Sequence, residues 1–377
     1  MVLIRDLQRR GALDRHALEE FLSSHSFPLV EGRTVTFVYR GHADEVHLQH
    51  WIYGLQSSQE FERLPGTDVW FHVMDLPEGS RVEYKFAVVQ RGRGQLIRDP
   101  LNPNLAHDPY GANSVVHAEG YEVPDWIDED PDARHGELQQ HELDTVDFGR
   151  RGIQVYLPAR FRESRRYPLL VVHDGSDYLR FASLKNVLDN LIHRLEIPPM
   201  VVALVDSQNR LQEYADDPRH ADFLADDLVP WMEEQFPLVG SPQTRGMLGS
   251  SFGAVASLSA AWRRPGVFGN LALLSGSFAF TDIGQDHERG PAFDPVVEFV
   301  NAFREEPGTP AEKVYLACGT YESLIYFNRS MLPLLQSTGM AVKYQEARDG
   351  HNWENWRDRL REGLSWLFPG PLWMVYE

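Results

Sequence analysis

Residues 249–253 read Gly-Ser-Ser-Phe-Gly and place the strongest constraint on how this chain can fold. The short apolar stretch 246–248 before them is typical of a strand, and the small-residue run 254–261 after them is typical of a helix. A Gly-x-Ser-x-Gly motif at such a junction indicates a nucleophile elbow, a sharp turn that holds Ser251 in a strained backbone conformation. The two glycines fit this turn because side chains there would collide with the neighbouring strand and helix.

Strand and helix patterns alternate through the second half of the chain. We expect strands at 152–157, 169–172, 200–205, 271–274, 314–317 and 342–346, and helices at 181–195, 223–236 and 353–367. Such alternation predicts a parallel sheet covered by helices on both faces. In sheets of this kind ligands bind at the carboxyl ends of the strands, where the elbow also lies.

The first half has a different pattern. Residues 1–24 show helix-like spacing, and short alternating runs separated by turn residues follow from 34 to about 117, which predicts a small β-sandwich. Residues 123–134 hold two prolines and five acidic residues and are interpreted as a linker. We therefore divide the chain into an N-terminal domain at 1–122, an acidic linker at 123–140 and a catalytic domain at 141–377.

The formal charge of −19 argues against nucleic acid and against anionic membranes as partners. No segment approaches the ~18–20 apolar residues of a membrane span, and residues 1–10 lack an apolar signal region, so we expect a cytoplasmic protein. The single cysteine, Cys318, excludes intrachain disulfides and is expected to be a buried strand thiol. Neither metal-ligand spacing nor a phosphate-loop lysine is found, so we expect no metal and no cofactor.

A serine hydroxyl needs a base to take its proton, and the base needs a partner that fixes its tautomer. The candidate base is His351, on a glycine-marked loop between the last expected strand and the last expected helix. Glu322 is the candidate acid, because it follows a strand and gives the chain order serine, acid, histidine. Asp349 is its rival, two residues before the histidine, and Asp282 is a third option.

Acyl transfer also requires N–H donors aimed at the developing oxyanion. The amide of Phe252, directly after the serine, is the first expected donor. The second is expected from the loop 173–178, where Gly175 would let the backbone approach a substrate and where we favour the amide of Ser176. An ordinary strand-to-helix turn remains the alternative for that loop.

Three further residues are assigned to substrate binding: Asp174, Gly175 and Arg210. The loop that carries Arg210 follows the strand 200–205 and points toward the same edge of the sheet. Arg210 either binds an anionic substrate group or pairs with Glu213, and the sequence leaves both readings open.

The chain resembles the enterochelin esterase group within the putative esterase family of α/β-hydrolases. In the second half the resemblance rests on segments 173–175, 209–214, 228–230, 248–253, 274–278 and 350–353 with Trp356. In the first half it rests on Leu-Pro-Gly-Thr-Asp-Val-Trp at 64–70 and Asp-Pro-Leu-Asn-Pro at 99–103. The resemblance implies an α/β-hydrolase fold with an N-terminal early-set, immunoglobulin-like β-sandwich domain.

The same resemblance implies that Ser251 is the nucleophile, His351 the base and Glu322 the acid of a serine esterase that opens catecholate-siderophore lactones, small-molecule esters, in the cytoplasm. Two alternatives remain. One is a feruloyl or acyl-carbohydrate esterase. The other is a carbohydrate-binding protein with an inactive hydrolase domain, in which Trp51 and Trp70 would form a stacking platform, although we expect both in the sandwich core.

Overall fold

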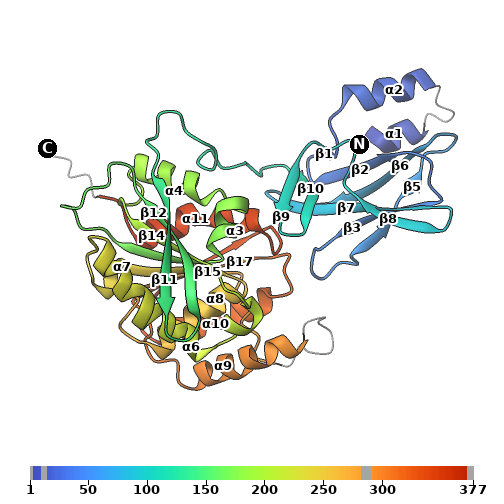
Figure 1. The fold of residues 1–377 in the computed structure, drawn as a ribbon. Coiled ribbons are helices and arrows are strands. Elements are labelled where there is room, and N and C mark those ends of the chain that lie inside the picture. Colours follow the sequence, from blue (N-terminus) through green and yellow to red (C-terminus); the bar gives the residue numbers. More distant parts are fainter. Residues whose placement is uncertain (1–2, 10–14, 282–289, 372–377) are drawn as a thin grey trace. The chain divides into compact units, whose positions relative to one another are not determined.

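The computed structural model describes residues 3–9, 15–281 and 290–371. The chain divides into two compact units, which are described separately (Figure 1). The first contains Met1–Val123 together with two later segments, Gly319–Ser323 and Ala347–Asn352. The second contains Pro124–Cys318, Leu324–Glu346 and Trp353–Glu377. The predicted N-terminal domain therefore lacks the two short loops that complete its compact unit.

Two antiparallel sheets form the first unit, with strand orders β1-β2-β6-β5 and β4-β3-β7-β10-β9, and β8 pairs with β7. Their inward side chains meet in one apolar core that includes Phe37 and Phe86. This arrangement is the predicted β-sandwich. The strands are β1 (Leu29–Glu31), β2 (Thr34–Arg40), β3 (Glu45–His50), β4 (Ser58–Glu60), β5 (Glu62–Arg63), β6 (Val69–Asp75), β7 (Arg81–Gln90), β8 (Arg93–Ile97), β9 (Leu105–Asp108) and β10 (Gly111–His117).

Two short helices, α1 (Leu3–Arg9) and α2 (Arg15–Ser24), lie within the helical segment expected at 1–24. Their apolar side chains join Val38 and Phe71 in a second core on the outer face of the β1-β2-β6-β5 sheet. Of the two tryptophans considered for the sandwich core, Trp70 is 8% exposed and Trp51 is 52% exposed. The core assignment is therefore wrong for Trp51, which lies just after β3 at the start of a loop.

An eight-stranded sheet forms the second unit, in the order β11-β12-β14-β13-β15-β16-β17-β18. Strands β14, β13, β15, β16 and β17 run parallel, while β12 runs antiparallel to both β11 and β14. The strands are β11 (Glu137–Thr145), β12 (Gly149–Leu157), β13 (Leu169–His173), β14 (Val201–Val205), β15 (Arg245–Ser250), β16 (Asn270–Leu274), β17 (Lys313–Gly319) and β18 (Ala341–Ala347).

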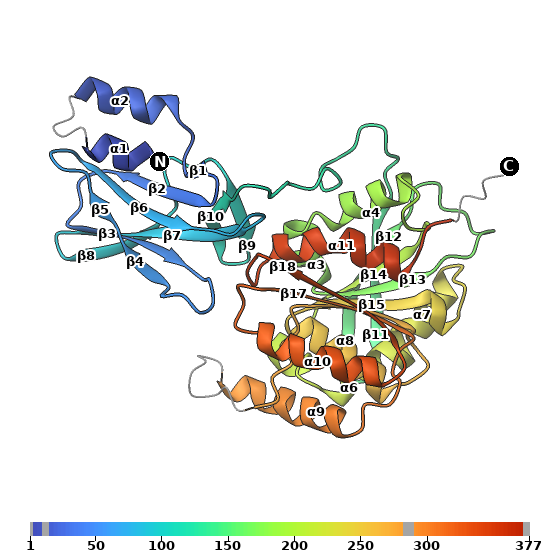
Figure 2. The ribbon, with the colours of Figure 1, turned by 180° about the vertical axis from the view of Figure 1, so that it is seen from behind.

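Helices cover both faces of this sheet, as Figure 2 shows, and each face has its own apolar core. On one face lie α3 (Gly175–Phe181), α4 (Leu184–His193) and α11 (Trp353–Leu367). The other face carries α8 (Phe252–Arg263), α9 (Asp294–Glu305) and α10 (Ile325–Ser337), together with α6 (Pro218–Asp222) and α7 (Val229–Gln235). The short α5 (Arg210–Glu213) follows β14. The predicted α/β-hydrolase architecture is confirmed.

The structure corrects three details of the sequence interpretation. The expected helix 181–195 is interrupted at Ser183, which has a φ of 49°, and the expected helix 223–236 begins as a π-helix over Phe223–Leu228. The acidic segment 123–140 is not a free linker, because Trp126 and Ile127 are buried against the second unit's own core. Its last residues, 137–140, belong to β11.

Cys318 is a buried cysteine near the end of β17, as expected from its apolar neighbours. Among the described residues, no group of three or more histidine, cysteine, aspartate or glutamate side chains is arranged to hold a metal ion. Within the same residues, no helix is both long enough and apolar enough to cross a membrane.

Candidate active site

Ser251 occupies the turn between β15 and α8 with φ 57° and ψ −120°, a conformation that L-residues rarely adopt. Its amide donates a hydrogen bond to the Leu274 carbonyl oxygen at 2.9 Å, and this bond fixes the turn to strand β16. Gly249 is required here, since a Cβ on it would lie 2.1 Å from the Gly253 carbonyl oxygen. The local backbone is thus the strained elbow that the motif predicts.

His351 and Glu322 come from the two loops that belong to the first unit. The imidazole Nδ1 lies 2.7 Å from Glu322 Oε2, and Glu322 is only 3% exposed. The other carboxylate oxygen, Oε1, accepts the Gly319 amide at 2.7 Å. A buried carboxylate on Nδ1 favours the tautomer with the proton on Nδ1, which leaves the lone pair of the neutral ring on Nε2. This is the tautomer that a general base needs.

Asp349 has different partners. Its carboxylate accepts hydrogen bonds from the Arg81 guanidinium, at 3.1 and 3.3 Å, and from the Asn352 side-chain amide at 2.8 Å. The group is buried, and burial raises the pKa of Asp349 to about 6 against the opposing effect of the Arg81 charge. The third candidate acid, Asp282, lies outside the described residues.

The two expected oxyanion donors differ in their surroundings. Phe252 is the first residue of α8, so its amide has no intrahelical acceptor. The Ser176 amide donates to Asp206 Oδ1 at 3.1 Å, and the Ser176 hydroxyl also bonds that carboxylate. The Ser176 amide, which the sequence favoured as the second oxyanion donor, is therefore already bonded to Asp206, directly after β14.

Gly175 is the neighbouring candidate. A Cβ on this residue would lie 2.5 Å from the Leu204 Cβ, so only glycine lets α3 pack this closely on β14. As the first residue of α3, Gly175 has an amide without an intrahelical acceptor.

Arg210 pairs with Asp174. This contact differs from both partners that the sequence suggested for Arg210, an anionic substrate group or Glu213. Its guanidinium Nε and Nη2 lie 2.8–2.9 Å from the Asp174 carboxylate, and Nη2 also donates to the Ser250 carbonyl oxygen at 3.2 Å. The alternative pairing with Glu213 is wrong, because Glu213 forms a buried ion pair with Arg151 at 2.6 Å. The Arg210–Asp174 pair ties the turn after β13 to the end of β15, next to the elbow.

Behind this turn lies a buried histidine pair that the sequence analysis missed. The Nε2 atoms of His173 and His220 are 3.0 Å apart, and His173 Nδ1 lies 3.1 Å from the Ser257 hydroxyl. Burial lowers the pKa of His173 to about 4 and the pKa of His220 well below its ordinary value. The residues are 47 positions apart in the chain, so no local pattern could have joined them.

This pair predicts acid sensitivity of the second unit. Because the folded-state pKa of His173 lies below the unfolded value of 6.5, its contribution to stability is present above pH 6.5 and is lost as pH falls toward 4. We expect the titration of His173 alone to lower the free energy of unfolding by about 2 kcal/mol as pH falls from 7.5 to 5. Urea titrations at these two pH values should show a smaller decrease in the free energy of unfolding for His173→Gln than for the wild type. An equal loss in both proteins would contradict the assignment.

Each of the two units matches a model of a known protein family. Residues 148–367 match the family model described as putative esterase, and residues 34–126 match the model for the enterochelin esterase N-terminal region. The chain is 26% identical to iron(III) enterobactin esterase of Dickeya dadantii, covering 83% of this chain and 80% of that protein. It is 24% identical to the protein of the same name from Escherichia coli K12, covering 81% of each.

Solved structures show the same fold. The enterobactin esterase of Shigella flexneri superposes with a TM-score of 0.73 at 21% identity, covering 93% of this chain and 98% of that one. The feruloyl esterase module of Clostridium thermocellum gives a TM-score of 0.51 at 17% identity, covering 67% of this chain and 95% of the module.

Proposed function

The chain belongs to the putative esterase family and is a carboxylic ester hydrolase resembling the enterochelin esterases; from that premise we propose that Ser251, His351 and Glu322 form its catalytic triad and that it opens catecholate-siderophore lactones. The single observation that carries the catalytic proposal is the strained elbow, which presents Ser251 between β15 and α8 at φ 57°. The 2.7 Å contact between His351 Nδ1 and Glu322 supports the assignment of base and acid.

In this proposal Ser251 Oγ attacks the ester carbonyl carbon while its proton passes to His351 Nε2. The amides of Phe252 and Gly175 stabilise the negative oxygen of the tetrahedral intermediate. Collapse of the intermediate breaks the ester C–O bond, and the imidazolium returns its proton to the leaving alcohol. Water, deprotonated by the same imidazole, then attacks the acyl-enzyme and restores the serine hydroxyl as the acid is released.

Arg210 has a supporting role in this scheme. Both oxygens of Asp174 accept from Arg210, so this carboxylate holds the arginine and the turn in place. Part of the Arg210 side chain stays accessible, with 35% of it exposed. In a chain of net charge −19, such a cation beside the elbow would provide a local site for an anionic substrate group.

The choice of substrate rests on the extent of the comparisons. Relatives named iron(III) enterobactin esterase match this chain through both units, and the N-terminal unit itself matches the enterochelin esterase N-terminal model. The feruloyl esterase module covers only 67% of this chain. A feruloyl or acyl-carbohydrate esterase is therefore the second candidate.

A substrate panel separates these candidates. We expect hydrolysis of iron-loaded and iron-free enterobactin with a kcat/KM at least about tenfold above that for methyl ferulate, a difference of about 1.4 kcal/mol in transition-state binding. The reverse order would favour the feruloyl candidate. Covalent labelling of Ser251 by a fluorophosphonate probe is expected in addition. An unlabelled, folded protein would favour the carbohydrate-binding alternative with an inactive hydrolase domain.

A further inference from the structure

Arg81, at the start of β7, is a fully buried arginine in the first compact unit, with 0% of its side chain exposed. A buried guanidinium is costly unless carboxylates and hydrogen bonds surround it, so its partners show which groups it holds in place. We infer that Arg81 is a positioning residue for His351. This inference rests on the proposed function, since it assigns to Arg81 the task of holding the loop that carries the catalytic base.

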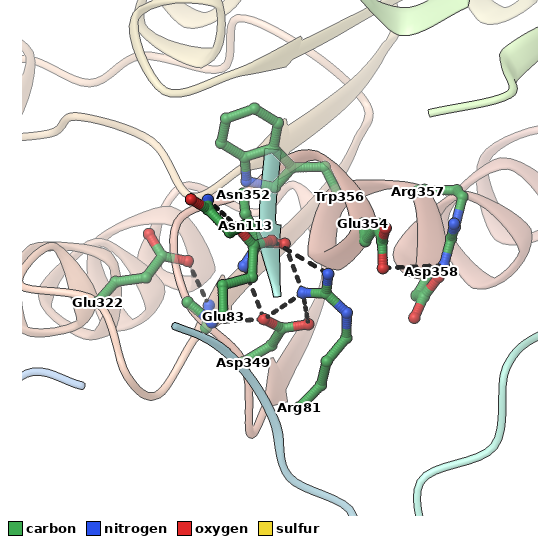
Figure 3. A network of polar contacts seen from close by, with 12 residues as sticks. Arg81, Glu83, Asn113, Glu322, Asp349, Asn352, Glu354, Trp356, Arg357 and Asp358 are labelled. Carbon is green, nitrogen blue, oxygen red and sulfur yellow. Dashed lines mark hydrogen bonds and ion pairs between the residues drawn. The ribbon is translucent and has the colours of Figure 1, made fainter. Parts of the chain in front are cut away.

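The guanidinium contacts the histidine loop on both sides of His351. Its Nη1 lies 3.1 Å from Asp349 Oδ1, two residues before the histidine, and 3.0 Å from Asn352 Oδ1, one residue after it. Figure 3 shows these contacts converging on the Arg81 guanidinium. The Arg81 amide also donates to the Arg348 carbonyl oxygen at 2.9 Å. Side chain and backbone of one residue thus bind both ends of the segment 348–352.

The loop is also closed on itself around the Asp349 carboxylate. The Gly350 amide and the Asn352 side-chain amide both donate to Asp349 Oδ1, at 2.7 and 2.8 Å. His351 is therefore enclosed between two residues that share hydrogen bonds with each other and with Arg81. This geometry limits the positions that its backbone can take.

The loop that carries Glu322 is fixed to the same unit. The Tyr321 amide donates to the Asp349 carbonyl oxygen at 3.1 Å, and the Tyr321 hydroxyl lies 2.5 Å from the hydroxyl of Ser80, the residue before Arg81. The acid and the base therefore share one support, and a shift of the histidine loop would also disturb its 2.7 Å contact with Glu322.

The charge arrangement explains why this position holds an arginine. The remaining terminal nitrogen, Nη2, lies 3.1 Å from Glu83 Oε1, and Glu83 in turn accepts from the Asn113 side chain at 2.7 Å. Only a planar fork with several donors can serve Glu83, Asp349 and Asn352 at the same time. A lysine would keep the positive charge and lose part of this geometry.

The test compares kcat and KM for p-nitrophenyl acetate in Arg81→Met, Arg81→Lys and wild type, each well below its unfolding midpoint. We expect Arg81→Met to lower kcat about tenfold or more while KM changes less than about threefold, because a displaced base slows proton transfer without removing a substrate contact. Arg81→Lys should recover part of the loss. Modification of Ser251 by the fluorophosphonate probe should slow in parallel.

The matched control is Arg40→Met, which removes another arginine of the same unit, one that pairs with Glu19 and Asp68. We expect its kcat to stay within about twofold of wild type. If Arg81→Met does not fold, Asn352→Ala removes one contact of the network and should still lower kcat. Variants that fold and keep wild-type kcat, or a loss that Arg40→Met reproduces, would overturn the inference. Failure of the wild type to hydrolyse any ester would instead overturn the proposed function.

Discussion

Replacing Ser251 by alanine is expected to lower kcat for p-nitrophenyl acetate on the order of 10⁵-fold or more, to the level set by substrate binding and the oxyanion donors alone. The reason is that no other group in the proposed scheme forms the acyl-enzyme. The measurement is steady-state hydrolysis, combined with mass spectrometry to detect the acyl adduct, which should be absent in the variant. The fold should survive, because removing one oxygen leaves the backbone of the elbow unchanged.

A matched control for this prediction is Ser259→Ala, two turns along helix α8. Ser259 is 2% exposed and its hydroxyl bonds Asp216, away from the elbow. We expect Ser259→Ala to lose about 1 kcal/mol of stability and to keep its kcat. Hydrolysis by Ser251→Ala at a rate within tenfold of wild type would contradict the nucleophile assignment.

Replacing Glu322 by glutamine is expected to lower kcat roughly 10⁴-fold. A glutamine amide would present either a donor or a neutral acceptor to His351 Nδ1. It could therefore neither hold the required tautomer nor stabilise the imidazolium that forms during proton transfer. The expected profile is a large fall in kcat with a small change in KM.

Asp349→Asn provides the comparison that decides the acid. Asp349 contacts Arg81, Gly350 and Asn352, so its loss should act only by loosening the histidine loop. We expect a fall in kcat of about tenfold, well short of that for Glu322→Gln. If Asp349→Asn causes the larger fall, the roles of the two carboxylates are reversed.

The features that were predicted from sequence are those with local causes. The turn around Ser251 follows from two glycines and a strand-to-helix change within a few residues, and helix α11 was expected with its observed bounds, 353–367. The α/β architecture follows from the alternation of apolar strands and amphipathic helices. Each of these signals lies within one continuous segment.

The features that sequence could not supply depend on contacts between distant segments. Glu322 and Asp349 both follow strands near the same sheet edge, so chain order alone left the choice of acid open, and only the side-chain partners distinguish them. For Arg210 the sequence left open an anionic substrate group or Glu213, three residues on, and the structure shows a bond to Asp174 instead of Glu213. Trp51 was placed in the core by its hydrophobicity, although a loop exposes it. In each case the answer depended on the three-dimensional surroundings of the side chain, which no local pattern in the sequence contains.

The loops 319–323 and 347–352 belong to the compact unit built by the N-terminal sandwich. A fragment that begins at residue 124 would retain the elbow serine, but it would leave Asp349 without the arginine that neutralises it and Tyr321 without its serine partner. In the proposed mechanism, the unit that contains the sandwich therefore supports the loops that carry the acid and the base. For a fragment that lacks Arg81, the proposal therefore predicts a histidine loop that is held less firmly than in the full chain.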